Sequence, residues 1–240
     1  MQSSEIIAVL EKNSRLFHPV VPFDPATDLL TALDFTHRNT TLTKEILNDT
    51  GRFAAWVNHQ LTDAHSRYGI GGYGEHRTIY SFSEVFDGNG MDQEPRRLHL
   101  GTDIWGPAGT KIMAPLEGTI HSFAFNDRVG DYGATIILAH LLEGIPFYTL
   151  YGHLSLNAVK NIQPGDRIGK GEVFADLGIP AENGGWPPHL HLQIINSIEG
   201  FEGDYPGVCK YSEREKWLAH SPDPELILQM KQFTDKISTE

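Results

Sequence analysis

The strict alternation of residues 189–194, His-Leu-His-Leu-Gln-Ile, is the feature that most constrains how this chain can fold. Side chains of an extended strand point alternately to its two faces, so His189, His191 and Gln193 share one face. The leucines and the isoleucine between them occupy the other face. The pattern therefore predicts a β-strand that is apolar toward the core and polar toward a cleft.

A second segment, residues 98–104, alternates in the same way. In the sequence Leu-His-Leu-Gly-Thr-Asp-Ile, an extended chain places His99, Gly101 and Asp103 on one side. Gly101 lies between two candidate metal ligands and adds no side chain, so we interpret it as clearance for a cation. Both segments are then polar toward one shared cleft.

Two imidazoles and one carboxylate suit a borderline cation such as zinc. They leave a fourth tetrahedral position for water, which is typical of a catalytic rather than a structural site. Cys209 is the only cysteine, which excludes a thiolate-rich zinc site and an intrachain disulfide. Magnesium and calcium prefer oxygen ligands. We therefore predict one zinc ion per chain, and the spacing alone leaves open which of His189 and His191 binds it.

A third segment, residues 147–154, carries a further histidine. Phe-Tyr-Thr-Leu-Tyr-Gly-His-Leu predicts a strand with Phe147, Thr149, Tyr151 and His153 on one face. Histidines beyond the metal ligands can orient the attacking water, take its proton and stabilise the oxyanion that forms at a carbonyl. His153 and one member of the His189/His191 pair fit that role.

These three segments resemble the motifs of the lysostaphin-type zinc metallopeptidases, which cut peptide cross-links of bacterial cell walls. The resemblance covers residues 98–195. It implies a zinc-dependent metalloendopeptidase with His99, Asp103 and His191 as zinc ligands, and with His153 and His189 as catalytic histidines.

Two departures from the commoner family pattern bear on the substrate. In the commoner pattern an acidic residue often follows the His-x-His motif, and Gln193 stands there in this chain. A Gly-Gly-Trp-Pro-Pro segment at residues 184–188 replaces the small Ser/Thr-Gly turn that often precedes the motif. The stiff Trp-Pro-Pro segment is expected to reshape the substrate groove. Trp186 has two interpretations, as a gate over the cleft or as a packing residue.

Two alternatives to a wall peptidase are kept. Several turns also resemble a subgroup in which this domain accompanies aminotransferase-like and kinase-like domains, which favours a small amine-containing metabolite as substrate of the same zinc centre. The other alternative is a non-catalytic binding module, either a scaffold or a phosphocarrier-like domain using His153 and His189. Intact ligands disfavour the scaffold, and Asp103 beside His99 disfavours the carrier.

The expected fold class is mainly β with α extensions, an antiparallel β-sheet or barrel-sandwich hybrid. Short runs bounded by glycine and proline predict strands at residues 111–114, 118–125, 134–140, 147–153, 167–177 and 190–195. His140, at the end of an apolar strand, is expected to be a buried structural histidine. We divide the chain into residues 1–90, a helical region with a linker, 91–200, the metallopeptidase domain, and 201–240, an extension with a closing helix.

Helical patterns are confined to the two ends of the chain. Helices are predicted after Ser4, after the Asp24-Pro25 pair and over residues 42–61, and a closing helix is predicted over residues 223–237. The glycine-rich segment 69–74 lacks the pattern of a phosphate loop and is expected to be a linker or a flap over the cleft.

Charge and hydropathy narrow the choice of partners. The formal net charge of −12 argues against nucleic acid and makes an anionic wall polymer a less natural ligand. The first residues lack a secretory pattern and no run is apolar enough to span a bilayer, so a cytoplasmic location without membrane insertion is expected. The expected partner is a peptide or a small amide substrate. The oligomeric state stays open.

Overall fold

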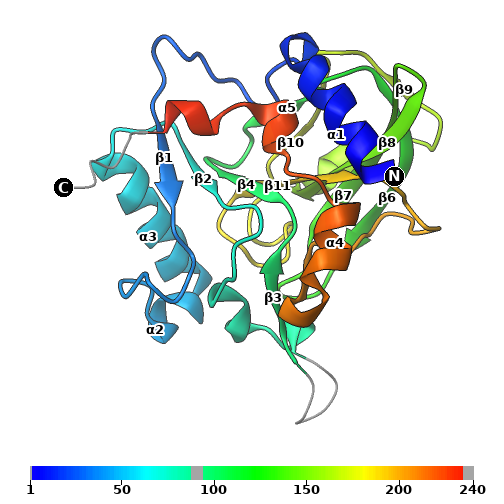
Figure 1. Ribbon diagram of the computed structural model, residues 1–240. Helices are drawn as coiled ribbons and strands as arrows, with labels where there is room; N and C mark the ends of the chain where they lie inside the picture. Colours follow the sequence, from blue (N-terminus) through cyan, green and yellow to red (C-terminus); the bar gives the residue numbers. More distant parts are fainter. Residues whose placement is uncertain (1, 88–93, 235–240) are drawn as a thin grey trace.

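The computed structural model describes residues 2–87 and 94–234 and is built on one eight-stranded sheet with the order β1-β2-β4-β11-β8-β7-β6-β9 (Figure 1). The strands of this sheet are β1 (Leu30–Leu33), β2 (Tyr68–Gly71), β4 (Thr102–Trp105), β6 (Gly118–Asn126), β7 (Gly133–Leu142), β8 (Ile145–Leu154), β9 (Arg167–Ile168) and β11 (His189–Ile195). All its pairs are antiparallel except β1 with β2. Within the described residues β1 does not pair with β9, so the sheet is open rather than a closed barrel.

Two small sheets and several short helices complete the architecture. β5 (Lys111–Met113) pairs with β10 (Val173–Asp176), and β3 (Arg96–His99) pairs with β12 (Val208–Lys210). The helices are α1 (Gln2–Lys12), α2 (Lys44–Leu47), α3 (Thr50–Asp63), α4 (Arg214–His220) and α5 (Glu225–Leu228), with 3-10 turns η1 (Ser14–Leu16), η2 (Ile79–Phe82), η3 (Glu84–Phe86), η4 (Leu156–Val159), η5 (Tyr211–Glu213) and η6 (Lys231–Phe233). The predicted class, mainly β with α extensions, is confirmed.

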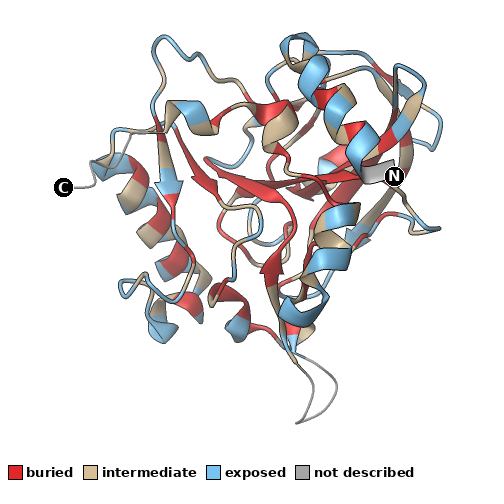
Figure 2. Ribbon diagram, in the orientation of Figure 1, coloured by how far each residue is buried: buried red, intermediate tan, exposed pale blue. Residues whose placement is uncertain are grey.

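The predicted strands between residues 111 and 195 are present, with residues 167–177 divided into β9 and β10. β7 and β8 form a long hairpin whose two-residue turn, Glu143-Gly144, has positive φ angles of 50° and 82°. That combination is typical of a tight turn whose twist matches the strands. Side chains that alternate with the polar cleft face, among them Ile104, Leu190 and Leu192, pack into the largest apolar core. Figure 2 shows the central strands almost wholly buried, whereas α1 and α4 expose one side.

The N-terminal region is less helical than expected. The helix after Ser4 and the helical segment over residues 42–61 are confirmed as α1 and as α2 with α3. The prediction of a helix after Asp24-Pro25 is wrong. The Asp24 carbonyl accepts from Asp28 N at 2.8 Å and closes only one turn. The chain then enters β1, where Leu30 and Leu33 are buried beneath neighbouring elements.

The predicted linker or flap at residues 69–74 is also wrong, because its first half is strand β2, inserted between β1 and β4. Gly69 permits this position: a Cβ there would lie 2.5 Å from Leu33 Cδ1 and 3.2 Å from Leu61 Cδ2. Leu33 of β1 and Leu61 of α3 therefore pack directly against the β2 backbone at Gly69. The main sheet thus extends across the predicted boundary at residue 90.

At the other end, the predicted closing helix is much shorter than residues 223–237. α5 stops at Leu228 because Gln229 takes a left-handed conformation with φ 50°, and the 3-10 turn η6 follows. Residues 235–237 lie outside the described residues. Among residues 2–87 and 94–234, no helix is long and apolar enough to cross a membrane.

His140 is the buried structural histidine that was expected. It is 5% exposed, its ring donates to Glu117 O at 2.8 Å, and its other nitrogen lies 2.7 Å from Thr149 Oγ1. Burial lowers the pKa of this imidazole to about 4.

We expect His140→Gln to weaken the acid sensitivity of the fold. Because the folded pKa lies below the unfolded value, the unfolded chain binds the proton first, so stability falls as the pH drops from 7 to 5. Urea unfolding of metal-free protein should show that His140→Gln loses about 2 kcal/mol less than the wild type between these pH values. An identical loss in both proteins would show that His140 does not carry the effect.

Candidate metal centre

Three donor atoms from two strands and the end of a third converge on one point. His99 Nε2 lies 2.9 Å from His191 Nδ1 and 3.3 Å from Asp103 Oδ1, and the last two atoms are 3.1 Å apart. Donors at about 2.0–2.1 Å from a tetrahedral zinc ion lie roughly 3.3 Å from one another. The three residues are buried and make up a group that could hold a metal ion. The triangle therefore fits a single small cation.

The backbone reaches this triangle differently from the expected continuous strand over residues 98–104. β3 ends at His99 and β4 begins at Thr102, and the two strands pair with different partners. The chain turns between them at Leu100 and Gly101. His99 and Asp103 nevertheless face the same space. The prediction that they share a face is therefore correct, but the single continuous strand from which it was derived is wrong.

Gly101 provides clearance for the His191 ring rather than for a cation. A Cβ at this position would lie 2.5 Å from His191 Cε1 and 2.6 Å from Leu192 O. Such distances are too short for any real contact, so the ring of His191 would have to move. Gly101 thus sets how closely His191 can approach β4.

Hydrogen bonds fix which nitrogen of each candidate ligand imidazole is free. His99 Nδ1 donates to Gly72 O at 3.0 Å, which leaves Nε2 with its lone pair. His191 Nε2 donates to Gln193 Oε1 at 3.1 Å, which leaves Nδ1 free. The amide nitrogen of Gln193 contacts Pro206 O and Ser221 Oγ, so its oxygen must face His191. Gln193 therefore orients His191, at a position where the family pattern more often has an acidic residue.

Asp103 divides its two oxygens between different partners. Arg77 Nη1 lies 2.5 Å from Asp103 Oδ2, and Oδ1 remains for the triangle. Arg77 is itself 1% exposed, lies over the Phe35 ring at 5.1 Å and bonds Glu75 Oε2 through Nε at 2.7 Å. Burial would raise the pKa of Asp103, but attraction of the carboxylate to His99 in its protonated form and to Arg77 outweighs burial and holds that pKa well below its usual value.

Sequence reasoning missed Arg77, and no local signal could have found it. It follows a segment interpreted as a linker, and its partner is 26 positions further along the chain. Only the insertion of β2 beside β4 brings the two together. Gly71, opposite Asp103 in this pair, leaves room for the guanidinium, since a Cβ there would lie 2.9 Å from Arg77 Nη2.

His153 and His189 lie beside the triangle with their ring centroids 4.1 Å apart. His153 Nδ1 donates to Asn183 O and His189 Nδ1 donates to Pro187 O, each at 2.8 Å. Each Nε2 is therefore a free acceptor. Burial lowers the pKa of His189 to about 4, and burial with the neighbouring His189 charge lowers the pKa of His153 well below its usual value. Both rings are neutral near pH 7.

His153 reaches this position through a bulge that alternation did not predict. Its φ angle is +63°, and the register of β7 against β8 shifts next to it. Tyr151 and Leu154 therefore share the main apolar core, while His153 lines the polar pocket. The expected common face for Tyr151 and His153 is wrong. A left-handed non-glycine residue carries backbone strain, which is a frequent feature of functional sites.

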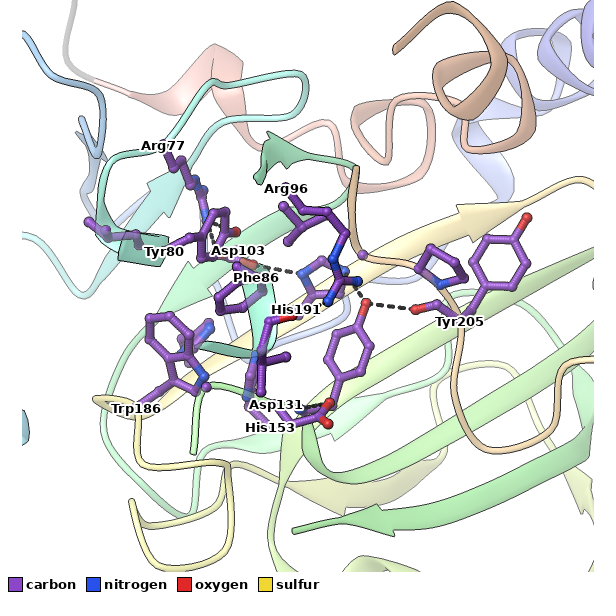
Figure 3. A pocket seen from close by; sticks show the side chains of 18 of the residues that line it. Arg77, Tyr80, Phe86, Arg96, Asp103, Asp131, His153, Trp186, His191 and Tyr205 are labelled. Carbon is purple, nitrogen blue, oxygen red and sulfur yellow. Dashed lines mark hydrogen bonds and ion pairs between the residues drawn. The ribbon is translucent and has the colours of Figure 1, made fainter. Parts of the chain in front are cut away.

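Four of the five residues, Asp103, His153, His189 and His191, line one pocket of about 160 Å³, whereas His99 does not line it (Figure 3). Tyr80, Phe86 and Trp186 form an aromatic wall, with the Tyr80 and Phe86 ring centroids 4.5 Å apart. Trp186 is 3% exposed and lies edge-on to His153 and His189 at 6.1 and 6.0 Å. It packs as part of the wall, directly against the two histidines.

Residues 97–202 match the sequence model of peptidase family M23. The resemblance inferred from the motifs over residues 98–195 is thereby confirmed. The matched segment contains the three residues of the triangle and both neighbouring histidines, but neither Arg77 nor Ser221.

Two curated relatives share part of the chain. An uncharacterized metalloprotease of Haemophilus influenzae is 31% identical over 139 residues, which is 55% of this chain and 27% of that protein. An L-Ala–D-Glu endopeptidase of Bacillus subtilis is 27% identical over 170 residues, 66% of this chain and 45% of that protein. The chain thus spans less than half the length of each relative.

Similar solved structures include LytU and the catalytic domain of lysostaphin from Staphylococcus simulans. The LytU structure is 24% identical with a TM-score of 0.38, covering 57% of this chain and 76% of its own. The lysostaphin domain is 25% identical with a TM-score of 0.39, covering 68% of this chain and 97% of its own.

We expect Gly101→Ala to weaken metal binding without touching any candidate ligand. The added methyl displaces the His191 ring, so zinc affinity should fall about 10- to 100-fold, the range for loss of ligand support. Competition with a chromogenic chelator would measure the affinity. The exposed Gly169 is a matched control, because a Cβ there meets only the end of the Glu172 side chain at 3.3 Å. Wild-type zinc affinity in Gly101→Ala would contradict the steric assignment.

Proposed function

We propose that this chain, whose residues 97–202 belong to peptidase family M23, is a zinc-dependent hydrolase of peptide or related amide bonds. The observation that carries the proposal is the approach of His99, Asp103 and His191 to within 2.9–3.3 Å of one another beside two neutral histidines. A mixed nitrogen and oxygen donor set of three is typical of a catalytic zinc site with one open position.

In this proposal His99 Nε2, Asp103 Oδ1 and His191 Nδ1 hold the zinc ion. A zinc ion held there supplies Lewis-acid polarisation and lowers the pKa of water toward about 7. The chain's own contribution is to keep the donor atoms unprotonated and directed toward one point. Burial, with the nearby charge of Arg77, lowers the pKa of His99 to about 3, so this ligand is neutral and does not compete with a proton near pH 7.

His153 and His189 are assigned the proton transfers. Their Nδ1–H groups are held by backbone carbonyls, so each Nε2 is presented to the pocket as an acceptor. One ring can take the proton of the attacking water, and a protonated ring can stabilise the oxyanion or return the proton to the leaving amine. Trp105 stacks on His189 with centroids 3.9 Å apart and fixes the plane of that ring.

The substrate class is inferred from two observations. The endopeptidase activity named for the Bacillus subtilis relative favours a peptide of the cell-wall type. The burial of His153 and His189, at 5% and 3% exposure behind the aromatic wall, favours a small or chain-terminal amide over the interior of a polymer. A small amine-containing amide therefore remains the second candidate for the same centre.

The division of labour among the histidines can be tested by substitution. His99→Ala and Asp103→Ala should lose zinc, whereas His153→Ala and His189→Ala should keep it and lose turnover about 10²- to 10⁴-fold. Zinc content and chelator-sensitive hydrolysis of peptidoglycan fragments and short glycine- or D-alanine-containing peptides would measure both effects.

His59→Ala is the control for these variants, because His59 is exposed on α3 and paired with Asp63. Full zinc content in His99→Ala and Asp103→Ala would refute the ligand assignment. Undiminished turnover in His153→Ala and His189→Ala would refute the catalytic assignment and leave the metal site standing.

A further inference from the structure

Arg96, the first residue of β3, lines the same pocket as Asp103, His153 and His191. Its guanidinium carbon lies 5.8 Å from the centroid of the Phe86 ring, and its Nη2 donates to Val85 O. These two contacts hold the planar group in place. Figure 3 shows the side chain directed toward His191 rather than away from the pocket.

Most of the hydrogen-bond donors of Arg96 are unused by the described part of the chain. A guanidinium has five N–H donors, and the bond to Val85 O takes only one of them. Arg77, the other arginine of the pocket, is by contrast bonded to Glu75, Tyr80 and Asp103. Within residues 2–87 and 94–234, no carboxylate forms an ion pair with Arg96.

Asp131 is the pocket carboxylate that the charge of Arg96 influences through space. Asp131 and Asp204 line the pocket, and Asp131 bonds Tyr132 N at 2.8 Å. Burial and the Asp204 charge together raise the pKa of Asp131 even though Arg96 opposes the shift. Among the described residues Arg96 is therefore a partly buried cation with no carboxylate paired to it. A guanidinium in that setting is suited to a planar anion bound through two parallel bonds.

We propose that Arg96 binds a free carboxylate of the substrate, next to the amide that is cleaved. This inference rests on the proposed function and narrows it. The carboxylate and the scissile amide must enter one pocket together, since Arg96 and the candidate catalytic histidines line the same walls. The substrate class is then an acyl amino acid or a peptide cleaved near a free carboxylate, not the interior of a cross-linked chain.

Binding to zinc-loaded protein tests the inference without requiring turnover. The probes are triglycine and D-alanyl-D-alanine, each with a free carboxylate and as its C-terminal amide. We expect at least one acid to bind the wild type about 10- to 100-fold more tightly than its amide, the range for hydrogen bonds to a charged group. The preference should vanish in Arg96→Gln and be partly kept in Arg96→Lys.

Arg97→Gln is the matched control. Arg97 is the next residue of β3, is paired with Asp87 at 2.5 Å, and is not among the residues that line the pocket. It should keep the full preference. A carboxylate bound to the zinc ion itself would keep the preference in Arg96→Gln, provided that zinc content is unchanged in that variant.

The inference is overturned by equal binding of acid and amide to the wild type, by no binding of either acid, or by a preference that survives in Arg96→Gln. The wild-type comparison stands even where a variant does not fold. Hydrolysis is measured separately. Cleavage of the probes without any acid preference would leave the proposed function standing and reject the role of Arg96. An Arg96-dependent preference without cleavage of any peptide would support carboxylate binding by Arg96 and count against the proposed function.

Discussion

The division of Asp103 between a buried arginine and two imidazoles is the interaction on which the site depends. Its Oδ2 lies 2.5 Å from Arg77, and its Oδ1 lies 3.1–3.3 Å from the donor nitrogens of His191 and His99. Removing one partner of a buried ion pair typically costs about 3–5 kcal/mol, because the other charge is left uncompensated. The same pair that stabilises the pocket thus presents one carboxylate oxygen, in one direction, to a cation.

Much of the support for the triangle comes from outside the segment that matches the family. Gly72 O and Arg77 lie upstream of residue 97 and fix His99 and Asp103. Ser221 lies downstream of residue 202 and fixes Gln193, which orients His191. Residues that orient metal ligands typically affect metal affinity 10- to 100-fold. The segments before residue 97 and after residue 202 therefore support the candidate metal ligands, and we propose that metal binding requires them.

Local periodicity predicted much of the β-rich part of the chain, and it singled out five residues that the structure brings close together. Alternation held for residues 189–195 because His189 and His191 lie on a regular strand whose alternate residues are packed in apolar cores. It failed where a long-range contact decides local structure. β2 is a strand because β1 and β4 flank it, and His153 turns into the pocket because a bulge with φ +63° overrides alternation. Arg77 had no signal in its own neighbourhood.

The most direct measurement is anomalous diffraction at the zinc edge from crystals grown with one equivalent of zinc. We expect a single strong peak at about 2.0–2.2 Å from His99 Nε2, Asp103 Oδ1 and His191 Nδ1, with His153 and His189 nearby but not coordinating. A peak bound by His153 or His189 in place of one of the three, or no peak in this pocket, would contradict the assignment of the metal centre.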